Sequence, residues 1–320
     1  MKKWIALLLT LSVMASFAGC AGGNEKADGT YTVGICQLVQ HPALDAATEG
    51  FQTALKDELG DKVTFDLQNA SGETPNCTTI INGFVSNKVD LIMANATAPL
   101  QAAASATAEI PVLGTSVTDY ASALEIDNWN GTVGTNVSGT SDLAPLDQQA
   151  AMVKELFPDA KTVGLLYCSA ESNSQYQVDV MTKELEALGM TGTPYSFTDT
   201  NDVASVAQAA CKEDVIFIPT DNTAAANTEA IANVVLAEGV PVVASEAGIC
   251  KGCGVATLSI SYYDLGYKTG LMAAKILKGE TKVNEMPVEF AGNPTKMYNE
   301  ANCETLGVAV PEGYDPLPVE

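Results

Sequence analysis

Three short apolar segments, each typical of a buried strand, occur twice in the chain and in the same order. They are 32–36 and 162–166, 89–95 and 213–219, and 109–114 and 239–244. The equivalent residues Val33 and Val163 are 130 positions apart, and Asp90 and Asp214 are 124 apart. Spacing this regular indicates an internal duplication, so we expect two similar lobes.

Short runs of β-branched residues alternate with longer segments of helical periodicity over the whole chain after residue 30. Strands are predicted near 31–36, 63–67, 90–94, 111–114, 162–167, 194–197, 214–218, 241–244 and 256–260. Helices are predicted at 42–58, 77–87, 99–108, 146–157, 174–188, 202–211, 223–238 and 264–278. The alternation predicts an α/β fold with two Rossmann-like lobes, parallel sheets and right-handed crossovers.

The first 20 residues have the composition of an export signal: two lysines, an apolar run over 4–17, and then Ala18, Gly19 and Cys20. The placement of Cys20 resembles the bacterial lipobox, which implies that this cysteine carries a lipid. An ordinary signal peptide with an accidental cysteine is the alternative. Residues 21–30 are small and polar, as in a flexible tether. We therefore expect an extracytoplasmic protein anchored to the cell membrane by lipid at Cys20.

The chain is acidic, with a formal net charge of −23, and it contains no arginine. Nucleic acid and anionic lipid surfaces are therefore poor partners. The absence of arginine excludes a bidentate guanidinium clamp on a carboxylate or phosphate. Any anionic group of a ligand must be held by lysine, hydroxyls or backbone N–H groups.

Catalytic and cofactor motifs are weak or missing. Cys250 and Cys253 form a single CxxC pair in what reads as a Gly-rich connector, which predicts a local disulfide or two ordinary thiols rather than a metal or redox site. His41 is the only histidine, so a metal site is not expected. We find no dinucleotide loop, Walker loop or nucleophile elbow. These observations predict a protein without cofactor, metal or enzymatic activity.

Ligands of open parallel sheets bind at the carboxyl ends of the strands, and the residues there are hydroxyls, amides and acids. This mixture suits a zwitterion. Residues 95–99, where a helix opens near Thr97, could hold a carboxylate, and Asp119 or Asp221 could answer an ammonium. Thr97, Asp119 and Asp221 could equally serve only as caps or turns. The aromatic residues placed near these ends are Tyr120, Trp129, Tyr167 and Tyr176.

Four ordered motifs, at 33–45, 68–73, 219–222 and 262–266, resemble the tryptophan/tyrosine-type substrate-binding lipoproteins of ABC importers. The resemblance implies a type I periplasmic-binding-protein fold, with crossings near 136–142, 254–258 and 283–288. Lobe 1 would then comprise 31–140 plus 255–284, and lobe 2 would comprise 141–254 plus 285–320. The residues carried over as cleft candidates are Gln37, Thr97, Thr118, Asp119, Ser169, Glu171, Asn173, Asp221 and Asn222.

The same resemblance implies a monomer that delivers a small solute to the permease and ATPase subunits of an importer. The zwitterion pattern favours an aromatic or large aliphatic amino acid as that solute. Two alternatives share the fold: a sugar-binding protein, which acids, amides and aromatic faces would also suit, and a sensory module that presents its ligand to a receptor. An exported enzyme is a third, and the missing catalytic constellation disfavours it.

Overall fold

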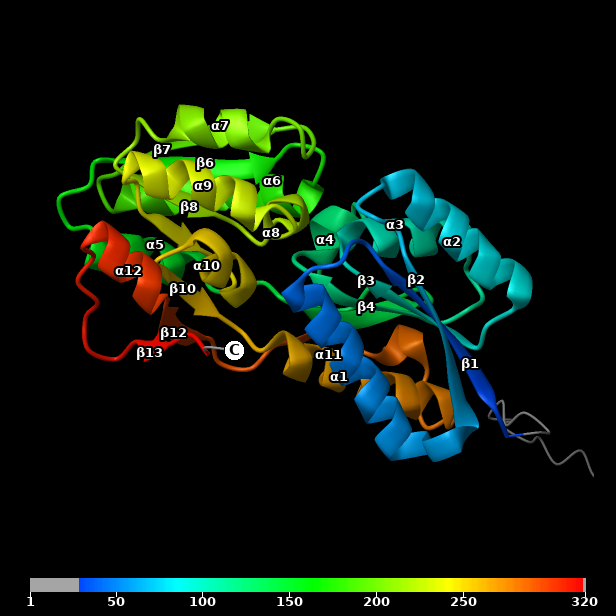
Figure 1. The fold of residues 1–320 in the computed structure, drawn as a ribbon. Coiled ribbons are helices and arrows are strands. Elements are labelled where there is room, and N and C mark those ends of the chain that lie inside the picture. Colours follow the sequence, from blue (N-terminus) through cyan, green and yellow to red (C-terminus); the bar gives the residue numbers. More distant parts are fainter. Residues whose placement is uncertain (1–28, 319–320) are drawn as a thin grey trace, which may run out of the picture.

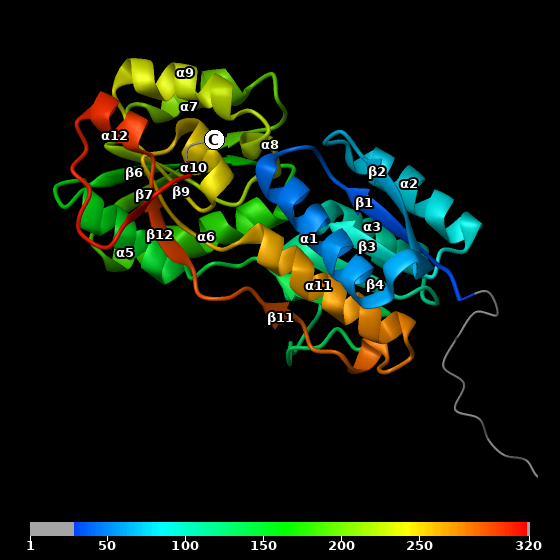
Figure 2. The same cartoon turned by 60° about the horizontal axis from the view of Figure 1, so that its bottom comes forward.

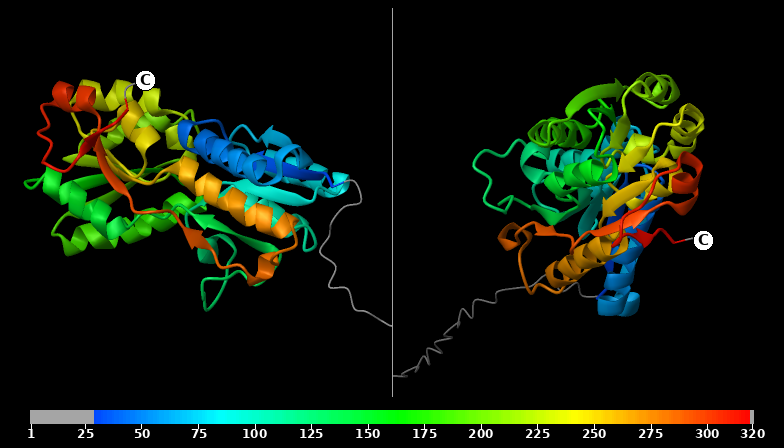
Figure 3. Two further views of the ribbon diagram at one scale, coloured as in Figure 1. Left: turned by 90° about the horizontal axis from the view of Figure 1, so that it is seen from below. Right: turned by 90° about the vertical axis from the view of Figure 1, so that its left-hand side faces the viewer.

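The computed structural model describes residues 29–318, which form two lobes side by side (Figure 1). The expected signal peptide, the lipid site at Cys20 and nearly all of the expected tether lie outside the described residues. Within 29–318, no helix combines the length and the apolar character needed to cross a membrane. The first described residues lie at the end of lobe 1 that is remote from lobe 2 (Figure 3).

Each lobe is built on one sheet. In lobe 1 all strands are parallel and their order is β11-β5-β4-β3-β1-β2. These strands are β1 Tyr31–Gln37, β2 Val63–Asn69, β3 Leu91–Asn95, β4 Val112–Val117, β5 Val137–Ser141 and β11 Glu289–Phe290. In lobe 2 the order is β13-β12-β10-β9-β8-β6-β7, and β12 runs antiparallel to β10. These strands are β6 Thr162–Cys168, β7 Thr191–Phe197, β8 Val215–Ile218, β9 Val242–Ala244, β10 Ala256–Ser259, β12 Thr295–Tyr298 and β13 Asp315–Pro316.

Helices cover both faces of each sheet, which leaves apolar cores on either side of it. Lobe 1 contains α1 Pro42–Leu59, η1 Gly60–Lys62, α2 Thr74–Asn87, α3 Thr97–Ala106, α4 Tyr120–Ala123, α11 Tyr262–Leu277 and η2 Val283–Glu285. Lobe 2 contains α5 Leu146–Leu156, α6 Ser172–Ala187, α7 Val203–Ala210, α8 Asn222–Ala225, α9 Thr228–Glu238, α10 Ala247–Cys253 and α12 Glu300–Leu306. The predicted α/β fold with two parallel-sheet lobes is confirmed.

The duplication is visible in the hydrogen bonds. In lobe 1 the backbone N–H of Thr32 donates to the Asp90 carboxylate at 2.7 Å. In lobe 2 the backbone N–H of Thr162 donates to Asp214 at 3.0 Å. Asp90 directly precedes β3, which pairs with β1, and Asp214 directly precedes β8, which pairs with β6. Thr32 lies near the start of β1, and Thr162 is the first residue of β6. The repeated segments therefore make the same contact twice.

Helices α1 and α11 lie side by side on one face of lobe 1, although more than 200 residues separate them (Figure 1, Figure 2). Glycines bring their backbones together. A Cβ atom at Gly266 would lie 1.9 Å from the carbonyl oxygen of Ala47, and one at Gly50 would lie 2.1 Å from that of Tyr263. Larger side chains at these glycines would force the two helices apart.

Strand pairing moves two of the predicted lobe boundaries. Strand β10 pairs with β9 and β12, so residues 255–259 belong to lobe 2, and the chain returns to lobe 1 only at 260–261. Strand β11 pairs with β5 in lobe 1, so the third crossing lies at 291–294 rather than near 283–288 (Figure 2). The first crossing follows β5, at 142–145, because residues 137–141 of the predicted crossing near 136–142 form a strand of lobe 1. Short apolar segments do not reveal their sheet partner in the sequence.

Several short elements were absent from the sequence prediction, among them β5, α10 and α12. The predicted Gly-rich connector around the CxxC pair is helix α10, which buries Cys250 and Cys253. All seven cysteines in the described part of the chain carry free thiols. Burial raises the pKa of both CxxC thiols, which keeps them protonated and unreactive.

Candidate functional site

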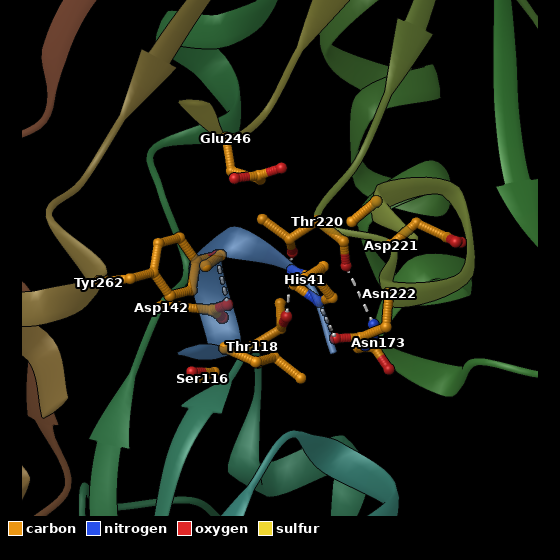
Figure 4. A pocket seen from close by; sticks show the side chains of 13 residues that line it. His41, Ser116, Thr118, Asp142, Asn173, Thr220, Asp221, Asn222, Glu246 and Tyr262 are labelled. Carbon is orange, nitrogen blue, oxygen red and sulfur yellow. Dashed lines mark hydrogen bonds between the residues drawn. The ribbon is translucent and has the colours of Figure 1, made fainter. Parts of the chain in front are cut away.

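The carboxyl ends of both sheets face the boundary between the lobes, where two adjoining hollows lie. The inner hollow is small, with a volume of about 10 Å³, room for about one water molecule. Its polar lining comprises His41, Ser116, Thr118, Asp142, Asn173, Thr220, Asp221, Asn222, Glu246 and Tyr262 (Figure 4). The outer chamber holds about 360 Å³ and shares Asn173 and Asn222 with the inner hollow.

The side chains of the inner hollow come from three sources. Lobe 1 supplies His41, just before α1, and the residues at the end of β4. Lobe 2 supplies the residues that follow β8 and β9, together with Asn173 of α6. Asp142 and Tyr262 stand where the chain leaves β5 and enters α11, at the two crossovers. The site therefore joins both lobes to the hinge between them.

Backbone geometry explains why Ser116 faces the hollow. The pairing of β4 with β5 is irregular between Gly114 and Val117, and Ser116 has a φ of +54°. A bulge of this kind turns a side chain out of its usual alternation. Left-handed backbone is costly for serine and is typical of functional sites.

Hydrogen bonds cross the cleft at two places. His41 Nε2 lies 3.2 Å from Asn222 Oδ1, and the hydroxyls of Thr118 and Thr220 lie 3.4 Å apart. At the hinge, the Tyr262 hydroxyl donates to Asp142 Oδ2 at 2.8 Å. These contacts hold the lobes in a closed arrangement.

Three buried carboxylates line the inner hollow, and two of them are committed to helix N-termini. Asp221 accepts from the backbone N–H groups of Ala224 and Cys168, at 2.8 and 2.6 Å. Glu246 accepts from the N–H of Gly248 at 2.7 Å and from that of Ile249. In Figure 4 the Asp221 carboxylate points away from His41.

The third acid, Asp142, is only 4% exposed, and its Oδ2 accepts the Tyr262 hydroxyl while Oδ1 has no partner. Burial raises its pKa to about 6, although the neighbouring hydroxyls of Tyr262 and Thr118 act in the opposite direction. Burial and the nearby charge of Glu171 likewise raise the pKa of Asp221. Burial raises the pKa of Glu246, an effect that the neighbouring His41 opposes. Each acid is thus destabilised in its charged form unless a cation enters.

Unpartnered polar atoms gather at this hollow. Across residues 29–318, five buried side-chain nitrogen or oxygen atoms have no hydrogen-bond partner, and three of them line the inner hollow: His41 Nδ1, Ser116 Oγ and Asp142 Oδ1. Buried polar atoms in folded proteins almost always have partners. Their convergence makes this hollow the candidate site for a polar ligand or a bound water molecule, either of which could supply the missing hydrogen bonds.

The predicted site residues are distributed between the two hollows and their surroundings. Thr118, Asn173, Asp221 and Asn222 line the inner hollow. Thr97 and Glu171 line the outer chamber. The Glu171 carboxylate accepts from the backbone N–H groups of Asn222 and Thr223 at 3.1 and 2.8 Å, so it also fixes the start of α8.

The other three predicted residues lie outside both hollows. Gln37 is buried in a network, where it accepts from Thr48 at 2.7 Å and donates to Asp45 at 2.6 Å. Asp119 caps α4 by accepting from the N–H of Ser122 at 2.7 Å. Ser169 is exposed and donates to the carbonyl of Phe197 at 3.2 Å. Thr97 is the first residue of α3 and makes no side-chain cap, since the capping position is Ala96.

The aromatic residues expected near the ligand also lie elsewhere. Tyr120 is buried in the core of lobe 1 and donates to the carbonyl of Thr140, and Trp129 packs against the same core. Tyr167 belongs to the core of lobe 2. Neither hollow is lined by these residues or by Tyr176. The aromatic side chain at the inner hollow is Tyr262.

Sequence reasoning left six lining residues out of its candidate set: His41, Ser116, Asp142, Thr220, Glu246 and Tyr262. Four of these, His41, Ser116, Thr220 and Glu246, lie within five residues of the end of a predicted strand. Asp142 and Tyr262 lie at crossovers, where no periodicity signal points to a ligand. In the part of the chain that the structure describes, no group of His, Cys, Asp or Glu side chains is arranged to hold a metal ion.

Comparison with known proteins gives consistent matches over nearly the whole chain. The family described as ABC transporter substrate binding protein matches residues 32–316. The tyrosine-binding protein of Clostridioides difficile is 34% identical, over 95% of this chain and 92% of its own length.

Two solved structures separate lobe fold from lobe arrangement. The complex of an ABC domain with L-Trp from Streptococcus pneumoniae is 32% identical, with a TM-score of 0.85 over 88% of this chain and 96% of its own. The ligand-free, open structure of a substrate-binding protein with adhesive properties from Clostridium difficile is 36% identical over 91% of this chain and 100% of its own, yet its TM-score is 0.69. Higher identity with the lower score indicates that the lobes here are arranged more nearly as in the complex than as in the open structure.

Proposed function

This chain belongs to the ABC transporter substrate-binding proteins, and on that premise we propose that it binds an aromatic or large aliphatic amino acid between its lobes and delivers it to an ABC importer. Proteins of this family bind solutes and are not enzymes. The permease and ATPase of the importer would be its partners.

The observation that carries the proposal is the convergence of three unpartnered polar atoms in the inner hollow. Ser116 Oγ can donate to an amino-acid carboxylate, whereas Asp142 Oδ1 can accept from its ammonium, as can His41 Nδ1 while Nε2 donates to Asn222. The relatives that bind tyrosine and L-Trp support an aromatic ligand.

The two hollows suit the two parts of such a ligand. The inner hollow could take the charged end of the ligand. Its present volume holds about one water molecule, so the lobes would have to separate slightly. The outer chamber, of about 360 Å³, has the size of a small-molecule site and includes the apolar Leu38, Val39 and Ala98. A large side chain would fit there.

Calorimetry tests the ligand class. Tryptophan, tyrosine, phenylalanine and leucine are titrated into the protein beside a panel of monosaccharides, after bound ligand has been removed by mild denaturation and refolding. We expect micromolar or tighter binding of at least one amino acid, about −8 kcal/mol or more favourable, and no heat from the sugars. Binding of a sugar alone would overturn the proposal.

We also propose that Cys20 carries the lipid that holds the protein at the outer face of the cell membrane. Support comes from Ala18, Gly19 and the apolar run before them. The tether would join lobe 1 at its end remote from lobe 2, which leaves the cleft free (Figure 3). Cys20→Ala should release folded protein into the medium. Retention of that variant in the membrane fraction would refute the assignment.

A further inference from the structure

We propose that Asp142, at the hinge, is the residue that recognises the ammonium group of the ligand, and that Tyr262 positions the carboxylate of Asp142. This inference rests on the proposed function and names the group that selects for it. It replaces the sequence-based expectation that Asp221 or Asp119 answers the ammonium.

The three acids of the inner hollow differ in what they have left to offer. Asp221 already accepts with one oxygen from an N–H at the start of α8 and with the other from the N–H of Cys168 at the end of β6, and both oxygens of Glu246 accept N–H groups at the start of α10. Asp142 alone among these acids keeps an oxygen, Oδ1, without a partner. A buried carboxylate with one free oxygen is a ready acceptor for a cation.

The surroundings of Asp142 provide no cation of their own. No lysine lines the inner hollow, and the chain has no arginine. The nearest nitrogenous side chain in the lining, His41, is paired through Nε2 with Asn222 and faces Glu246 across the hollow. Three acids facing one histidine leave the hollow short of positive charge. A ligand ammonium would supply it, whereas an uncharged sugar would not.

The geometry at the hinge determines which carboxylate oxygen would receive the ligand ammonium. The Tyr262 hydroxyl donates to Oδ2 at 2.8 Å and leaves Oδ1 unpartnered in the hollow. Asp142 directly follows β5, and Tyr262 is the first residue of α11. The ammonium site thus stands on the two crossovers, between the lobes, rather than within either of them.

The test compares two ligands that differ only in the ammonium. L-tryptophan and L-tyrosine are titrated beside their des-amino analogues, 3-(indol-3-yl)propionate and 3-(4-hydroxyphenyl)propionate. In the wild type we expect the better amino acid to bind about 100-fold more tightly than its analogue. In Asp142→Asn, we expect that amino acid to lose about 100-fold while the analogue keeps its affinity or gains.

Two further variants keep the test independent of folding artefacts. Asp147→Asn makes the same substitution at an exposed position of α5 and should bind both ligands as the wild type does. Tyr262→Phe removes only the donor to Oδ2, and we expect it to lower the preference for the amino acid over the analogue by about fivefold. A purely structural role of Tyr262 would weaken both ligands equally and would contradict its assignment.

The outcomes separate this inference from the proposed function. If the wild type binds tryptophan or tyrosine and Asp142→Asn binds it equally well, the ammonium lies elsewhere and the inference is wrong while the function stands. Equal wild-type affinity for the amino acid and its analogue would also overturn it. If the wild type binds sugars and no amino acid, both fall together. Circular dichroism of Asp142→Asn confirms that the variant measured is folded.

Discussion

At the amino ends of their strands the two lobes use the same device, since Asp90 holds the N–H of Thr32 in lobe 1 and Asp214 holds that of Thr162 in lobe 2. At the carboxyl ends they differ. Lobe 1 gives the cleft a histidine and two hydroxyls, and lobe 2 gives it amides, a hydroxyl and two acids. One half of each duplicated unit maintains the fold, and the other half has diverged to build a site.

The unequal walls of the cleft impose an orientation on whatever binds there. Ser116 and Thr118 place hydroxyl groups on the lobe 1 side, and the two acids of lobe 2 accept backbone N–H groups. Asp142, which keeps an oxygen without a partner, stands at the hinge. A zwitterion fits such a cleft in one direction only. Two identical lobes would give no such preference.

The largest expected effect concerns the contact between α1 and α11, the helix that returns to lobe 1 late in the chain. In Gly266→Ala the new methyl group would lie 1.9 Å from the carbonyl of Ala47, so α1 and α11 must separate. We expect the free energy of unfolding to fall by about 3 kcal/mol or more. Urea denaturation followed by tryptophan fluorescence measures this loss.

Gly83→Ala is the matched control, because its added methyl group meets no atom within 4 Å on helix α2. Alanine favours helix over glycine, so this variant should be as stable as the wild type or about 1 kcal/mol more stable. Equal stability of the Gly266 and Gly83 variants would show that the α1–α11 contact is not close.

Substitution of the hinge acid Asp142 gives an intermediate effect on stability, and its size depends on pH. Burial raises the pKa of Asp142 to about 6 from an unfolded value of 3.8, so the folded state binds its proton more tightly. Its cost to ligand-free stability is therefore absent at pH values below the unfolded pKa, grows between about pH 4 and pH 6, and is fully present above pH 6. Asp142→Asn should stabilise the ligand-free protein by about 2 kcal/mol near pH 7.5 and by nothing near pH 4.

Urea unfolding at both pH values checks this, with ligand removed. Glu246 and Tyr262 face the same carboxylate, so the wild-type curve contains their titration too, and only the difference between variant and wild type isolates Asp142. A stability gain that is the same at both pH values would contradict the assignment.

The smallest expected effect concerns the hydrogen bond that the two lobes share. Asp90→Ala and Asp214→Ala each remove a carboxylate that holds backbone N–H groups, and we expect each to cost about 1 kcal/mol. Hydrogen bonds from Lys161 and Thr162 lower the pKa of Asp214, so its share of stability should disappear as pH falls through that lowered pKa.

Asp61→Ala, at an exposed position of η1, should change stability by less than about 0.5 kcal/mol. Thermal unfolding of the three variants, measured in parallel, gives the ranking. A loss confined to one lobe would show that the repeated hydrogen bond has different roles in the two.

The fold could be predicted from the sequence because its signals are local and repeated. Strand and helix periodicity, together with the segments around Val33 and Val163, established two parallel-sheet lobes. Lobe boundaries were less predictable, since short strands such as β10 and β11 join a sheet through partners far away in sequence. Local patterns carry no information about such pairing.

The site was predictable only where it follows the strand-end rule. That rule brought Thr118, Asn173 and Asn222 to the cleft. It could not distinguish Asp221, whose oxygens face backbone N–H groups, from an acid that faces a ligand. It also passed over Asp142 and Tyr262, because their positions depend on how two crossovers meet in space.

The close packing of α1 against α11 constrains the order in which the protein can mature. The first 110 or so residues of lobe 1 emerge well before Met272, Ala273 and Leu277, which complete the core on that face of its sheet. Lobe 2 in turn needs β12, which follows the last strand of lobe 1. Lobe 1 can therefore be completed only after residue 290 has emerged, and lobe 2 only after β12, so the chain must be almost fully synthesised before either lobe has all of its strands.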